Sequence, residues 1–79
     1  MDEATRTQLS RIDAAIEFMA NLEGQDPMLI VEMSQAMLAD VIETGELRPM
    51  ADYVKQYCDV IDSPEDAEQY AAMIAAEEG

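Results

Sequence analysis

The sequence contains no histidine and no tryptophan, and it has one cysteine and only four basic residues among 79. Without histidine, the commonest general base and metal ligand is missing. The single cysteine, Cys58, excludes an internal disulfide and a thiolate zinc site. No Gly-rich phosphate loop or Gly-x-Ser-x-Gly elbow occurs, and no histidine is available to activate Cys58. We therefore expect a protein that is not an enzyme and that holds no cofactor.

Long apolar runs are also absent. The longest strictly apolar run, residues 28–31, is far shorter than a membrane-spanning helix. The first residues are acidic and polar, whereas a signal peptide needs a basic stretch followed by an apolar one. We expect a soluble, cytoplasmic protein with one domain over residues 1–79.

Acidic residues are abundant: 18 Asp and Glu give a net charge of −14. Because 49% of the residues are apolar, the chain can form a core and is not a disordered acidic tail. The charge repels phosphates, so direct binding to nucleic acid or to an anionic membrane is not expected, and a basic partner is favoured. Spread over a bundle about 25–33 Å long, the charge amounts to roughly one per 2 Å, close to the one per ~1.7 Å of duplex DNA.

Two glycines, Gly24 and Gly45, and three prolines divide the chain into stretches with helical periodicity. We expect Gly24 and Gly45 just after helix ends, and Asp26-Pro27 and Ser63-Pro64 at helix starts. Ser63 and Asp66 together resemble a capping box. The predicted fold is all-α, a compact four-helix bundle that is mostly antiparallel. Its helices are expected at roughly 3–23, 27–43, 49–61 and 64–78.

The second predicted helix is apolar over much of its circumference, so we expect it nearest the centre of the bundle. Met28 and Met73 are the methionines expected at the surface. Tyr53 and Tyr57 share a helix face and are expected at the edge of the core, with their hydroxyls in water. The inward-facing residues predicted for the second helix are Ile30, Met33, Met37, Leu38, Val41 and Ile42.

The distribution of charge predicts a binding surface. Residues 12–47 and 56–79 contain no base. In an up-and-down bundle, the first and third loops lie at the same end, and we expect no Lys or Arg in these loops or their flanking turns. Arg6, Arg48 and both termini are expected at the other end. The predicted partner-binding residues are Glu17, Glu23, Asp26, Asp59, Asp62, Glu65, Asp66 and Glu68.

Two other readings apply to some of these acids. Asp59, Asp62, Glu65 and Asp66 are close enough in sequence to gather oxygen ligands for a metal. However, the alternating acids and the glycine of an EF-hand loop are missing, so no metal site is predicted. Acids at the start of a helix also satisfy free N–H groups and the helix dipole, and this capping role explains the same residues.

In size, charge and lack of histidine, the chain resembles the small acidic anti-CRISPR proteins of phages, several of which mimic DNA. The resemblance covers the whole chain loosely and includes no motif that assigns a role to any residue. It is similar above all to the inhibitors of type I surveillance complexes (Cascade). The resemblance implies a non-catalytic inhibitor in the host cytoplasm that binds the basic DNA-binding groove and blocks target recognition.

Two alternatives stay open. The chain is also compatible with a small helical interaction module, such as an antitoxin, an adaptor or a phage regulator, that binds through an apolar face. It is compatible as well with a small acidic subunit that is merely soluble and structural. Binding that weakens as salt is added distinguishes an acidic mimic from an apolar surface.

Overall fold

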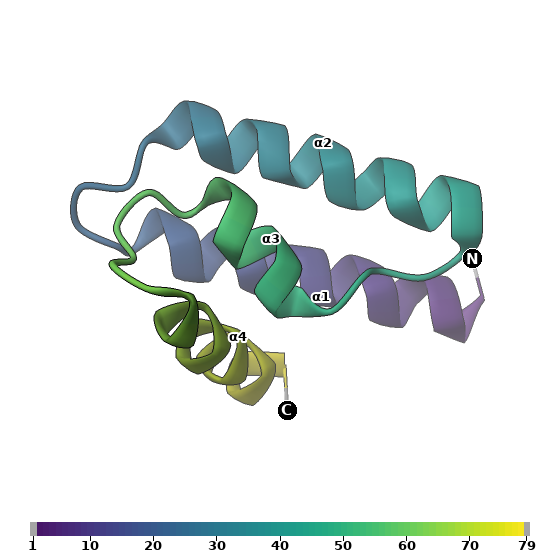
Figure 1. The fold of residues 1–79 in the computed structure, drawn as a ribbon. Helices are drawn as coiled ribbons and strands as arrows, with labels where there is room; N and C mark the ends of the chain where they lie inside the picture. The colour runs from purple at the N-terminus through teal and green to yellow at the C-terminus, as the bar shows by residue number, and fades with distance from the viewer. Residues whose placement is uncertain (1, 79) are drawn as a thin grey trace.

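The structure, a computed structural model, describes residues 2–78 and contains four helices (Figure 1). They are α1 (Glu3–Ala20), α2 (Pro27–Thr44), α3 (Met50–Tyr57) and α4 (Pro64–Glu78). No strand occurs within residues 2–78. The predicted all-α bundle is therefore confirmed.

The chemistry of the helix ends follows the sequence closely at α2. Asp26 caps its N-terminus by accepting a hydrogen bond from the Met28 N–H at 2.9 Å, and Pro27 takes the first helical position. Gly45 ends the helix with φ of 82°, and its N–H donates to the Val41 carbonyl. Such a left-handed residue suits glycine, which has no Cβ to clash.

Two predicted helix ends are wrong. The first helix stops at Ala20 with Asn21 as its C-cap, so Gly24 lies inside the loop rather than just after the helix. The third helix ends at Tyr57, four residues before the predicted end. Cys58 has an extended backbone, and the next N–H, that of Asp59, donates to the side chain of Gln25. A long-range bond thus replaces the helical one.

The helices form a ring of neighbours: α1 contacts α2 and α4, and α3 contacts the same two helices. In Figure 1, α1 and α2 lie side by side as an antiparallel pair, whereas α4 is seen nearly end-on and crosses α1 steeply. Phe18 of α1 meets Tyr70 of α4 edge to face, with ring centroids 5.4 Å apart. Aromatic pairs prefer this geometry, and the contact fixes α4 against α1.

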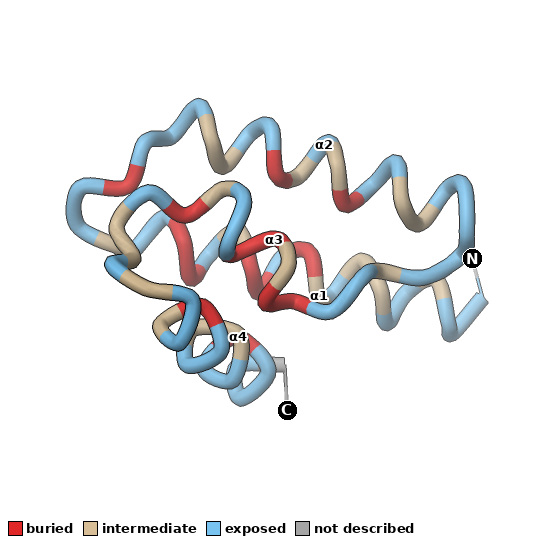
Figure 2. The backbone as a smooth tube through the Cα atoms, viewed as in Figure 1, coloured by how far each residue is buried: buried red, intermediate tan, exposed pale blue. Residues whose placement is uncertain are grey.

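The core does not centre on α2, and that prediction is wrong. Helix α1 buries five side chains and α2 buries two, Met33 and Met37. Leu38 and Ile42, which we expected to face inwards, are exposed. One of the two neighbours of α2 is the eight-residue α3, which covers less than half of its 18-residue length. Figure 2 shows exposed positions along the side of α2 that faces away from the other helices.

Candidate functional site

The loops at residues 21–26 and 58–63 meet at one end of the molecule, on the left of Figure 1. Gln25, which is 9% exposed, joins them. Its Nε2 donates to the Tyr57 carbonyl at 3.0 Å, and its Oε1 accepts from the Asp59 N–H at 3.1 Å. The side chain of one residue of the first loop therefore satisfies two backbone groups where α3 passes into the second loop, which fixes the relative position of the two loops. We call this region the loop end.

The predicted site residues in the two loops are thus brought together at the loop end. They differ in whether their carboxylates make hydrogen bonds within the protein. The side chains of Glu23, Asp59 and Asp62 are exposed. Asp26 is also exposed, although its carboxylate caps α2. The capping role considered from the sequence therefore applies to Asp26, which still presents its negative charge to solvent.

The first turn of α4 supplies two more acids of the loop end. Glu65 is exposed, whereas Asp66 is half-buried. Asp66 Oδ2 accepts a hydrogen bond from the Asp62 N–H at 3.1 Å. In a capping box this bond would come from the N-cap, Ser63, so Asp66 reaches one residue further back than predicted.

A base lies near the loop end, and the sequence analysis missed it. Because α3 is shorter than predicted, Lys55 falls in its last turn. Lys55 Nζ lies 4.0 Å from Glu68 Oε1, and both side chains are largely exposed. The expectation that no base flanks these loops is therefore wrong, and Glu68 is partly neutralised. An exposed pair of this kind contributes little to stability.

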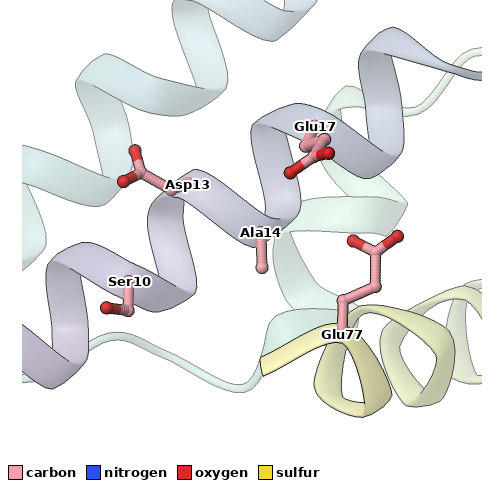
Figure 3. Close-up of a pocket in the computed structure, with 5 residues that line it drawn as sticks. All are labelled: Ser10, Asp13, Ala14, Glu17 and Glu77. Atoms are coloured by element: carbon pink, nitrogen blue, oxygen red, sulfur yellow. The ribbon is translucent and has the colours of Figure 1, made fainter. Parts of the chain in front are cut away.

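Glu17 stands apart from the loop acids. It lies about one turn before the end of α1, in a shallow groove between α1 and the last turn of α4 (Figure 3). Asp13 and Glu77 complete the acidic lining, with Ser10 and Ala14, and the Glu77 carboxylate points towards α1. The last turn of α4 therefore lies beside the middle of α1 and not at the end opposite the loops, where the C-terminus was expected; Met1 and Gly79 themselves lie outside the described residues.

A second surface lies along the outer side of α2, where large apolar side chains are exposed; of these, only Met28 was expected at the surface from the sequence. Met28 is 64% exposed, Val31 47%, Leu38 42% and Ile42 82%. Together with Gln35 they recur at alternating intervals of three and four residues, so they form one stripe on the helix. We call it the outer stripe. The inner stripe of the same helix, which includes Met33 and Met37, is spaced similarly and packs against the core.

Tyr53 corrects another prediction, because it is fully buried and its hydroxyl is not in water. The hydroxyl donates to Asp40 Oδ2 at 2.7 Å and accepts from the Arg48 N–H at 3.0 Å. Arg48 Nε also donates to Asp40 Oδ2 at 3.2 Å, and the guanidinium lies 4.8 Å above the Tyr53 ring. This cluster fastens α2 to α3 and to the segment between them.

The contacts within this cluster also shift the pKa values of Asp40 and Tyr53. The hydrogen bond from Tyr53, followed by that from Arg48, lowers the pKa of the Asp40 carboxyl. Burial, followed by the bond to Asp40, raises the pKa of the Tyr53 hydroxyl. Asp40 therefore stays ionised and serves the fold, which makes it a weaker partner-binding candidate than the exposed acids.

The Cys58 thiol and the grouping of the acidic side chains are the next features. Burial raises the pKa of the Cys58 thiol, which keeps it protonated at neutral pH. Within residues 2–78 no group of three or more Cys, Asp or Glu side chains is arranged to hold a metal ion. The loop-end acids and the outer stripe are surfaces suited to contact with another macromolecule.

Comparison with protein-family models, curated proteins and solved structures finds no match to this chain. Within the same residues, no helix combines the length and the apolar character that crossing a membrane would require.

Proposed function

We propose that this protein is a non-catalytic acidic inhibitor that acts in the cytoplasm of the host cell by binding a basic DNA-binding protein. The observation that supports it is the pair of hydrogen bonds by which Gln25 holds the two acidic loops together. As a result, Glu23, Asp26, Asp59 and Asp62 lie at the same end of the molecule. Along the longest dimension, 37 Å, the net charge of −14 corresponds to about one charge per 2.6 Å, within a factor of two of duplex DNA.

The candidate target is the DNA-binding groove of a type I CRISPR surveillance complex, because the composition resembles inhibitors of such complexes. A groove that binds DNA is lined by Lys and Arg spaced to meet phosphates, and clustered carboxylates can occupy the same positions. Bound there, the protein would exclude target DNA without any covalent step.

The test is a competition experiment with a purified type I complex and a labelled target duplex, repeated at several salt concentrations. Wild-type protein should displace the duplex, and its affinity should fall as salt is added. The double variant E23K/D59K should weaken displacement several-fold, with the larger loss at low salt. Both residues are exposed and follow helix C-termini, where the dipole disfavours acids, so the variant should stay folded.

The matched control is E43K/E46K, because each double variant changes the net charge from −14 to −10. Glu43 and Glu46 are also exposed and lie at the C-terminal end of α2, away from the loop end. The control should displace the duplex nearly as well as wild type. If the control loses affinity and E23K/D59K does not, the binding acids are those of α2. If wild-type protein does not displace the duplex from the complex even at low salt, this target is ruled out.

A second candidate function is a helical protein-interaction module, and the outer stripe of α2 favours it. Monomeric soluble proteins rarely expose large apolar side chains as one continuous patch unless the patch binds something. Within residues 2–78, four of the five large exposed hydrophobic residues lie on this one helix. Binding through the outer stripe should respond to substitution of Ile42 and much less to salt.

A further inference from the structure

The outer stripe has the dimensions of a helix-docking surface. Residues 28, 31, 35, 38 and 42 fall within an arc of roughly 80° on the helix, over 15 residues or about 22 Å. The alternating spacing is that of positions that meet a second helix. Gln35, at the centre, is the only polar member, and a single polar residue in such a seam fixes the register of the partner.

Charge is distributed unevenly beside the outer stripe. Glu32 and Glu43 are exposed and are eleven residues apart, close to three full turns, so they share one flank at a separation of roughly 16 Å. The remaining acid of the helix, Asp40, is engaged by Tyr53 and Arg48. Because residues 12–47 contain no base, nothing on α2 itself neutralises this flank.

We propose that the outer stripe docks an amphipathic helix of a partner protein whose apolar seam is flanked by Lys or Arg. This inference rests on the second candidate function and names the chemistry of the partner. The seam fills the stripe, and two basic side chains about three turns apart meet Glu32 and Glu43. Apolar contact supplies most of the affinity, and the charges set partner choice and orientation.

A second copy of the chain fits this surface poorly. A symmetric pair would bring two molecules of net charge −14 together with no base on either α2 to face the acids. A partner helix that carries opposite charge avoids this repulsion and adds charge contacts to the apolar ones.

The probe for the experiment is a labelled synthetic helix of about three heptads with Leu in the seam and Lys on its flanks. Binding to the full-length protein is followed by fluorescence anisotropy. Two comparison peptides replace either the flanking Lys by Glu or the seam Leu by Ser. The Lys-flanked peptide should bind more tightly than the Glu-flanked one by about tenfold or more, and the Ser-seam peptide should not bind.

Variants of the protein locate the contact. M28Q/I42Q alters the two most exposed apolar residues of the stripe, so the fold should be retained, and affinity should fall about tenfold or more. E32Q/E43Q should lower the affinity for the Lys-flanked peptide several-fold and reduce the salt dependence of binding. The matched control is M73Q, because Met73 is 54% exposed on α4, and it should leave affinity unchanged.

Several results would overturn the proposal. Equal binding of the Lys-flanked and Glu-flanked peptides would exclude the basic partner. Loss of affinity in M73Q but not in M28Q/I42Q would exclude the outer stripe. Sedimentation of wild type as a dimer that M28Q/I42Q dissociates would assign the stripe to a second copy. E23K/D59K should leave peptide binding intact, so a failure of the loop-end inhibitor function is distinguished from a failure of this one.

Discussion

Helices α1 and α2 are equal in length, 18 residues each, but they use their apolar residues differently. Helix α1 is the more polar of the two, yet it buries Ile12, Ala15, Phe18 and Met19 against its neighbours. Helix α2 is richer in Met, Leu, Ile and Val, yet it buries only two residues and exposes four large ones. Apolar content therefore does not determine burial, which depends on how many neighbours a helix has and how long they are.

The neighbours explain the difference. Helix α1 packs against two long helices, α2 and α4, whereas α2 packs against α1 and the short α3. In the described structure α2 and α4 make no contact, so the far side of α2 faces solvent. Water-exposed apolar surface contributes nothing to stability, which makes the outer stripe available for a role in binding.

The largest expected effect compares two methionines, one from each helix. Met19 is fully buried in α1, and Met19→Ala should lower the free energy of unfolding by about 3 kcal/mol through lost burial and a cavity. Met28 is exposed at the start of α2, and Met28→Ala should change it by less than about 0.5 kcal/mol. Urea unfolding of both variants measures the difference, and equal losses would show that α2 is as deeply packed as α1.

An intermediate effect comes from the cluster that holds α2 to α3. Tyr53→Phe removes the donor to Asp40 and the acceptor of the Arg48 N–H, so it should cost about 1–2 kcal/mol at pH 7. Tyr57→Phe makes the same change at a hydroxyl for which residues 2–78 offer no hydrogen bond, and it should cost under about 0.5 kcal/mol.

The loss of stability in Tyr53→Phe should depend on pH. Since the pKa of Asp40 is lower in the folded chain than its ordinary value of 3.8, its contribution to stability is complete above that pH. The contribution is lost as the pH falls through the lowered value. The stability difference between wild type and Tyr53→Phe should therefore shrink below about pH 4. A difference that stays constant down to pH 2 would show that Asp40 is not the partner that matters.

The smallest expected effect concerns charge, which also differs between the helices: α1 carries Arg6 and Arg11, and α2 carries no base. Adding salt to a low-salt buffer should raise Tm by a few degrees, because screening relieves repulsion among acids. Lowering the pH from 7 to about 5 should act in the same direction. Thermal unfolding followed by circular dichroism measures both, and a Tm that falls with salt would mean that most carboxylates are paired or capping.

The sequence predicted the parts of the fold that local chemistry controls. Asp26-Pro27, Gly45 and Pro64 mark helix ends because capping, a positive φ and a missing N–H act within one turn. The end of α3 was missed because the Asp59 N–H donates to Gln25, 34 residues away. A hydrogen bond over that separation leaves no periodic signal in the sequence.

The two candidate surfaces were also predictable from the sequence only in part. Chain order alone predicted that the loops around Glu23 and Asp59 share an end, and Gln25 confirms that they meet. The outer stripe has a visible signal, since residues 28, 31, 38 and 42 repeat at helical spacing. However, α2 carries two apolar stripes, and the periodicity does not tell which one meets the short α3.

The hydrogen bonds of Gln25 order the backbone of the loop end, and the outer stripe has no comparable restraint on its Met28 side chain. At the loop end, a buried amide holds both loops, so Glu23 and Asp59 extend from a backbone that is already in place. A partner that binds there has little loop motion to arrest, and preorganisation of this kind favours affinity. On the outer stripe, the unbranched Met28 keeps several rotamers until something contacts it, whereas the β-branched Val31 and Ile42 are already restricted by the helix. The loop end thus presents its acids on a backbone already in place, whereas on the outer stripe Met28 is the side chain that can adapt to what it contacts.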